Sequence, residues 1–100
     1  MVKIVVLYGP PADAGAFEGH YTTTHAGLVA KLPNLRRFEA GRFVGAPDGG
    51  DAPYYRIAEL WFDSQEDLQA AMASTEGQET VADIPNFASG GATVLIAAVD

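Results

Sequence analysis

The residues best suited to chemistry lie in one short segment, 17–25, which reads Phe-Glu-Gly-His-Tyr-Thr-Thr-Thr-His. Tyr21 and His25 are four residues apart, so in an α-helix their side chains share a face and can touch. An imidazole suits proton transfer near neutral pH, and a phenol can donate a hydrogen bond to a developing oxyanion. We therefore predict His25 as an acid–base catalyst, with Tyr21 orienting the substrate or His25. The alternative is a structural histidine bonded to a backbone carbonyl at a helix edge.

A metal site built on the two histidines is not expected. His20 and His25 are five residues apart, which places them about 140° apart around an α-helix, unlike an i,i+4 chelating pair. No third ligand is evident, and the chain contains no cysteine. The sequence thus predicts no metal and no cofactor, and it leaves the role of His20 open.

Aromatic residues outside this pair are candidates for the walls of an apolar pocket between helix and sheet. The predicted substrate-binding residues are Phe17, Trp61, Tyr8 and Phe87. Core packing is the alternative for each of them. Glu59 shares a strand face with Trp61, so it is buried and paired if that face points inward, and solvated if it points outward. Arg56 of a second copy of the chain is a candidate partner for Glu59.

The elements that must position these residues follow from hydrophobic period and turn residues. Strands are predicted at 2–8, 35–44, 54–62 and 92–99. A helix is predicted from about 14 to 32, capped by Asp13, and a second from Ser64 to about Gly77, with a short helical turn within 78–87. The order strand-helix-strand-strand-helix-strand indicates one α+β domain over residues 1–100, with the ferredoxin-like fold: four antiparallel strands and helices on one face.

The strand pattern also predicts a second copy of the chain. Two helices cover only one face of a four-stranded sheet, yet segments 2–8 and 92–99 carry apolar residues on both faces. A homodimer that packs sheet face against sheet face, burying about 800 Å² per partner, would cover the other face.

Composition narrows the possible partners and locations. The 100 residues carry a formal net charge of -7, with nine of the 13 acidic residues and only one of the six basic residues after residue 50. Nucleic acids and anionic membranes require a basic surface, so neither is expected as a partner. No apolar run approaches the roughly 20 residues of a membrane span, and the first residues do not form a signal peptide. A cytoplasmic location is therefore expected.

Several segments together resemble the EthD family. Residues 17–29 read F-E-x-H-Y-x-x-x-H-A-x-L-V, residues 32–38 read L-P-N-L-R-R-F, and the later segments 58–64 and 73–77 read A-E-L-W-F-D-S and A-S-x-E-G. The resemblance covers most of the chain in the family's order and spacing. This chain differs from the family in having Gly27 where a proline commonly follows the motif histidine by two residues.

The resemblance implies a dimeric α/β barrel in which each chain holds a pocket between its helices and sheet, with His25 matching the motif histidine. Related barrels include isomerases, cyclases, decarboxylases and monooxygenases, so the fold transfers better than the reaction. We expect a cofactor-free protein that binds an apolar, oxygen-bearing small molecule and catalyses proton transfer of the isomerase, cyclase or lyase type. The alternatives are a non-catalytic binding or accessory dimer in a degradation (catabolic) pathway and, with less support, a haem-binding protein.

Overall fold

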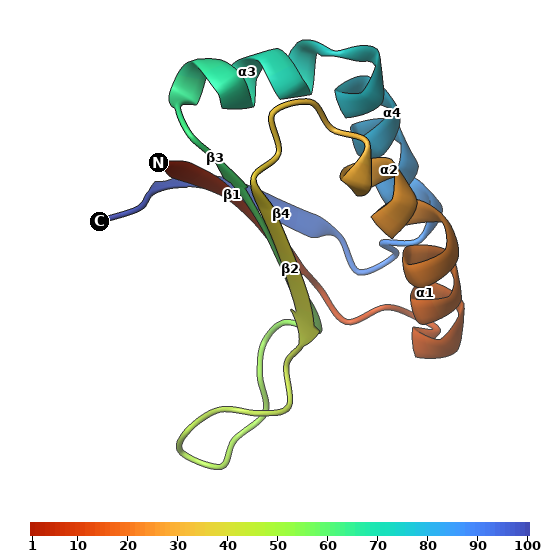
Figure 1. Cartoon of the computed structure of the whole chain (residues 1–100). Coiled ribbons are helices and arrows are strands. Elements are labelled where there is room, and N and C mark those ends of the chain that lie inside the picture. The colour runs from red at the N-terminus through yellow and green to blue at the C-terminus, as the bar shows by residue number, and fades with distance from the viewer.

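Four antiparallel strands form one sheet in the order β2-β3-β1-β4. The computed structural model describes residues 1–100. Its strands are β1 (Val2–Tyr8), β2 (Arg37–Arg42), β3 (Arg56–Phe62) and β4 (Ala92–Ala98). Its helices are α1 (Ala14–His20), a π-helical turn (Tyr21–His25), α2 (Ala26–Ala30), α3 (Gln65–Ala73), α4 (Thr75–Asp83) and a 3₁₀ turn (Ile84–Asn86). All helices lie on one face of the sheet (Figure 1), so the predicted ferredoxin-like fold is confirmed.

The core forms between that helical layer and alternate residues of the two central strands. Ile4, Val6 and Tyr8 of β1 point towards the helices and are buried. Their register partners on β3 are Leu60, Ala58 and Arg56, which are buried as well. The two-residue period of a strand places all of these side chains on one face. The same period places Lys3, Val5 and Leu7 on the opposite face.

Serine and aspartate side chains set where the helices begin. Asp13 Oδ1 accepts a hydrogen bond from the Ala16 N–H at 3.0 Å and caps α1, as predicted. Ser64 caps α3 in the same way. The predicted continuation of that helix to Gly77 is wrong, because Ser74 is extended and its Oγ caps a new helix, α4. The chain therefore turns between α3 and α4, and α4 runs through most of the segment predicted as a short turn.

The largest departure from the predicted first helix is the π-helical turn at Tyr21–His25. The N–H of Ala26 reaches back five residues to the Tyr21 carbonyl. The hydroxyls of Thr22 and Thr23 donate to the carbonyls of Glu18 and Gly19 at 2.7 and 2.6 Å, so these carbonyls have partners where the α-helical pattern is interrupted. The widened turn invalidates the α-helical wheel that set His20 and His25 far apart.

The second face of the sheet carries no helix (Figure 1). β4 is an edge strand, and its apolar residues Val94, Leu95 and Ile96 are each about half exposed, at 54%, 53% and 51%. Both faces of this strand therefore remain uncovered in the single chain. The loop between β2 and β3 projects away from the sheet and is longer than the predicted one, because both strands are shorter than expected.

None of the helices combines the length and apolar character that crossing a bilayer requires.

The close approach of α3 to α4 makes Gly77 sensitive to substitution. A Cβ at this position would lie 2.1 Å from the Ala71 carbonyl oxygen and 2.8 Å from Met72 Cα, both backbone atoms that cannot move aside. We expect Gly77→Ala to lower the free energy of unfolding by about 1–3 kcal/mol, as overpacking does. Gly27→Ala is the control, because this helical glycine has open space around it; we expect a gain of about 0.5–1 kcal/mol. Urea unfolding of both variants measures this, and equal effects would contradict it.

Candidate functional site

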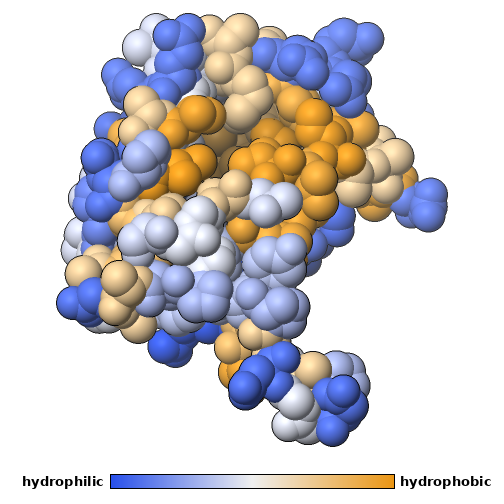
Figure 2. Space-filling view, turned by 180° about the vertical axis from the view of Figure 1, so that it is seen from behind, coloured by the Kyte–Doolittle hydropathy of each residue, from blue (hydrophilic) through white to orange (hydrophobic).

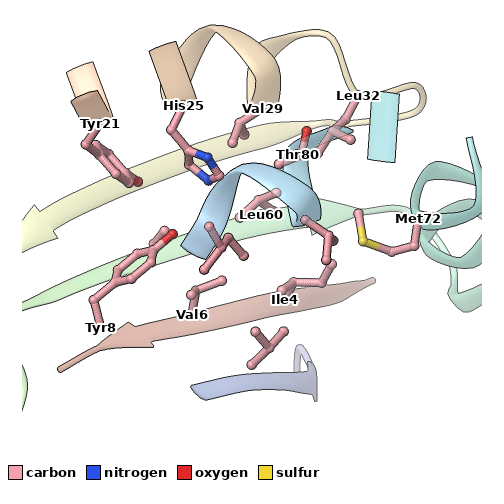
Figure 3. A pocket seen from close by; sticks show the side chains of 14 residues that line it. Ile4, Val6, Tyr8, Tyr21, His25, Val29, Leu32, Leu60, Met72 and Thr80 are labelled. Carbon is pink, nitrogen blue, oxygen red and sulfur yellow. The ribbon is translucent and has the colours of Figure 1, made fainter. Parts of the chain in front are cut away.

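A cavity of about 60 Å³ lies between the helical layer and the sheet. Figure 3 shows Tyr21, His25 and Val29 pointing towards it from the helical side, and Tyr8, Val6 and Ile4 from β1. Twelve of its fourteen lining residues are hydrophobic; the full set is Ile4, Val6, Tyr8, Tyr21, His25, Val29, Leu32, Ala58, Leu60, Met72, Thr80, Val81, Ile84 and Val94. The volume exceeds the roughly 10–15 Å³ that one water requires, so a small organic group fits.

The cavity opens beside the uncovered edge of the sheet. Val81 of α4 and Val94 of β4 both line it, and both are 54% exposed. Seen from behind, hydrophobic residues surround a hollow on this side of the molecule (Figure 2). The opening of the cavity between α4 and β4 is therefore apolar.

Polar groups gather at one end of this otherwise apolar space. The hydroxyl of Tyr21 is completely buried and has no hydrogen-bond partner. Burial raises the pKa of Tyr21 to about 12, although the nearby Arg56 opposes this shift. The phenol is thus neutral at pH 7 and keeps its proton for donation. A buried polar atom without a partner is costly, and a ligand oxygen would satisfy it.

Asp83 holds both histidines. Its Oδ2 lies 2.9 Å from Nδ1 of His25, and Oδ1 and Oδ2 lie 2.8 and 3.0 Å from Nε2 of His20. Asn86 donates from Nδ2 to Oδ1 of the same carboxylate at 3.0 Å. His25 is 3% exposed, whereas the side chain of His20 is 30% exposed. The cluster therefore runs from the cavity, through one carboxylate, to solvent.

The protonation states follow from burial and from these bonds. Burial lowers the pKa of His25 below its ordinary value, and the Asp83 carboxylate only partly offsets this. Burial opposes ionisation of Asp83, but hydrogen bonds from Asn86, His20 and His25 outweigh it and hold its pKa below the usual range. At neutral pH, His25 is therefore uncharged with Nδ1–H donating to Asp83. This leaves Nε2 with a free lone pair, as a general base requires.

A partly buried ion pair lies beside Tyr21. The guanidinium of Arg56 lies 4.6 Å from the centre of the Tyr21 ring, and Arg56 is only 8% exposed. It forms a salt bridge with Glu18, which also accepts a hydrogen bond from the Tyr55 hydroxyl at 2.8 Å. Burial disfavours ionisation of Glu18, but the bonds from Arg56 and Tyr55 keep its pKa lowered. Arg56 thus pairs with Glu18 of its own chain, on the face of β3 opposite to Glu59.

Two of the predicted pocket residues pack behind the cavity. Phe17 stacks on Tyr21, with ring centroids 5.7 Å apart. Phe87 contacts the rings of His25 and His20 at 4.6 and 5.5 Å. Neither phenylalanine lines the cavity. Phe17 instead packs against Tyr21, and Phe87 packs against His20 and His25, so they hold these three rings in place.

Trp61 lies on the other side of the sheet from the cavity, contrary to its predicted place in the pocket wall. It is covered by Lys3 and Arg37, whose charged groups lie 5.1 and 4.8 Å from the ring. Glu59 shares this outer face and forms a 3.2 Å salt bridge with Lys3. Its carboxylate is therefore partly exposed and paired. The alternation of β3 puts Leu60 towards the helices, and so Trp61 away from them.

Asp83 was not identified from the sequence, although its position carries a signal. It is the last residue of α4, where the helix dipole disfavours a negative charge. An acidic residue at such a position, followed by a turn-forming proline at 85, needs a cationic or hydrogen-bonding partner. No group of three or more His, Asp and Glu side chains has an arrangement that could hold a metal ion.

Comparison with known proteins yields close matches across the chain. The sequence model of the EthD domain matches residues 9–91. An uncharacterized 11.0 kDa protein in the thcB-thcC intergenic region of Rhodococcus erythropolis is 42% identical over 95% of this chain and 91% of its own length.

Solved structures show the same fold. The crystal structure of an ethyl tert-butyl ether d (EthD) family protein from Bacillus halodurans is 39% identical, covers 100% of this chain and 99% of its own, and has a TM-score of 0.93. A dimeric ferredoxin-like protein of unknown function from Thermobifida fusca has 15% identity and a TM-score of 0.73, with 98% and 90% of the two chains covered. The Bacillus halodurans protein is similar in both sequence and structure over the whole chain, whereas the Thermobifida fusca protein shares only the fold.

The geometry around Asp83 predicts how stability depends on pH. The folded protein favours neutral His25, so the contribution of this group to the free energy of unfolding is complete above its ordinary pKa of 6.5. That contribution is lost as the pH falls from 6.5 through the lower pKa of the folded state. The contribution of ionised Asp83 is complete above its ordinary pKa of 3.8 and is lost at still lower pH. We expect the free energy of unfolding to decrease between pH 7 and 5. Urea unfolding measures this change, and NMR titration assigns it to His25. A His25 pKa at or above 6.5 would contradict it.

Removing the shared charge tests the cluster directly. We expect Asp83→Asn to lower the free energy of unfolding by about 1–3 kcal/mol, because two imidazoles lose a charged acceptor in a buried site. It should also lower the pKa of His25 further, since Asp83 raises it. Asp63→Asn is the control, because its bond to Arg36 is exposed; we expect a change below about 1 kcal/mol. Equal losses would show that Asp83 is an ordinary surface carboxylate.

Proposed function

The chain belongs to the EthD family, and from this premise we propose that it binds an apolar small molecule bearing an oxygen and moves a proton on it with His25. The observation that carries this proposal is the pairing, at one end of an apolar cavity, of the Tyr21 hydroxyl and a neutral His25 held by Asp83. The two groups supply the donor and the base that enolisation of a carbonyl compound needs. No step of this chemistry calls for a cofactor.

The reaction would proceed through an enol or enolate. Nε2 of His25 removes a proton from the carbon next to the carbonyl, and the electron pair moves onto the carbonyl oxygen. The Tyr21 hydroxyl donates a hydrogen bond to that oxygen. Asp83 fixes the imidazole with Nδ1–H towards it and stabilises the imidazolium that forms. Return of the proton to a different carbon gives isomerisation, and loss of a leaving group gives elimination.

His20 is a positioning residue in this scheme. It bonds to the same carboxylate as His25 but does not line the cavity. Its partly exposed side chain links Asp83 to solvent. Its hydrogen bond to Asp83 therefore helps to hold the carboxylate that orients His25.

Exchange of α-protons for deuterium tests the assignment without the natural substrate. In D₂O the protein should accelerate deuterium incorporation into a small ketone such as butanone, followed by mass spectrometry. We expect His25→Gln to reduce the protein-dependent rate by about 10²-fold or more, the usual loss of a general base. His20→Gln is the matched control and should reduce the rate far less. The reverse order would move the base to His20. Binding without exchange would favour the non-catalytic alternative.

We also propose that the chain is a homodimer through the outer face of the sheet. The helix-free face carries the apolar residues Val5, Leu7, Ile57 and Leu95. Contiguous apolar surface of this kind typically marks an interface, and the fold is shared with a dimeric ferredoxin-like protein. The cation-covered Trp61 lies at one end of this face.

A charge placed on this face should separate the two copies. We expect Leu95→Glu to convert a stable dimer into monomers at micromolar concentration, because an interface of about 800 Å² per partner does not tolerate a buried, unpaired carboxylate. Ala70→Glu is the control, since this residue is exposed on α3 in the helical layer. Sedimentation velocity measures both. A monomeric wild-type chain would disprove the dimer, and a dimeric Leu95→Glu variant would place the interface elsewhere.

A further inference from the structure

We propose that the cavity selects an un-ionised carbonyl compound, such as a ketone, ester or lactone, and rejects the carboxylate of the same shape. This inference deepens the proposed function and rests on it. The selectivity follows from the charged and polar groups around the cavity.

No positive charge is available to a ligand in the cavity. None of the residues that line it is a lysine or an arginine. The guanidinium of Arg56 lies over the Tyr21 ring, 4.6 Å from its centre, and Arg56 does not line the cavity. Its charge is already matched by Glu18 in a partly buried salt bridge. A ligand carboxylate would therefore find no unpaired cation.

A negative charge, in contrast, lies directly behind the base. Asp83 is 7% exposed and bonds to Nδ1 of His25, on the far side of the ring from the free Nε2. Burial also favours the neutral form of His25, which then offers a lone pair and not a cation. An anionic ligand would face that lone pair and the carboxylate behind it. Burying such a charge without a partner is strongly unfavourable.

The remaining polar groups favour a neutral acceptor. The hydroxyls of Tyr21 and Tyr8 belong to side chains that line the cavity, and the buried Tyr21 hydroxyl has no partner; one carbonyl oxygen has lone pairs enough for both. The hydroxyl of Thr80 is not available, because it donates to the Glu76 carbonyl at 2.7 Å. Uncharged phenol donors and one base in an apolar space match a compound with a single carbonyl and no charge.

Matched ligand pairs test this selectivity on the purified full-length protein. The pairs are butanone with propionate, and cyclopentyl methyl ketone with cyclopentanecarboxylate; in each, a methyl group replaces a charged oxygen. Binding is measured at pH 7.5 by NMR shifts of the residues around the cavity. We expect each ketone to bind at least tenfold more tightly than its carboxylate. Carboxylates that bind as tightly as the ketones would overturn the selectivity while leaving the pocket proposal standing. Binding of neither member of the pairs would overturn the proposed function itself.

Glu18→Gln provides the decisive variant. It keeps a hydrogen-bonding side chain beside Arg56 but leaves the guanidinium charge unmatched behind Tyr21. We expect the preference for ketone over carboxylate to fall by threefold or more, with ketone affinity little changed. Glu39→Gln alters the net charge equally but lies on β2 beside Arg37, away from the cavity. It should leave the preference unchanged. Equal effects of the two variants would show that overall charge, and not the local balance, sets the selectivity.

Discussion

The site depends on one carboxylate that accepts hydrogen bonds from two imidazoles. Asp83 bonds to His20 and His25 within 3.0 Å, although an α-helix would direct residues five apart to different sides. The π-helical turn removes that obstacle, and the hydroxyls of Thr22 and Thr23 occupy carbonyls where the helical pattern changes. π-turns are frequent at functional sites because they redirect side chains without ending the helix. Here the π-helical turn joins α1 to α2. The helix therefore continues past Gly27, the position where the family commonly has a proline.

The sequence was sufficient to predict the fold and to name three residues that line the cavity, Tyr8, Tyr21 and His25. Periodicity located β1 at its observed bounds. Tyr21 and His25 both line the cavity, although the π-helical turn between them is not the α-helix that their spacing was taken to indicate. Prediction from the sequence failed where the backbone departs from a regular helix or where the contact is distant in the sequence. The α-helical wheel could not foresee the π-turn, and Asp83 lies 58 residues from His25, beyond any local pattern. Trp61 was assigned to the wrong face of β3, because an aromatic residue is common on either face of a strand and the sequence alone does not show which face points to the helices.

Buried charge in this small protein is arranged in two closed groups. Glu18, Arg56 and Tyr55 form one, and Asp83 with the two histidines and Asn86 forms the other. Each carboxylate stays ionised because its hydrogen bonds outweigh the effect of burial. The Tyr21 hydroxyl lies among these groups and belongs to neither. A fold that satisfies its charges so completely, yet leaves one buried donor free, has room for an acceptor that comes from outside.

The edge strand β4 links the cavity to the uncovered face of the sheet. Val94 lines the cavity, while the next residue, Leu95, points to the opposite face. A second copy packed on the outer face would contact one set of alternate residues and hold the other set in place. The entrance beside Val81 is formed partly by this strand, so its width depends on how firmly β4 is held. In the proposed dimer, assembly and ligand access would therefore be coupled through β4. Substitutions on the outer face of the sheet should therefore be tested for effects on both dimer formation and ligand binding.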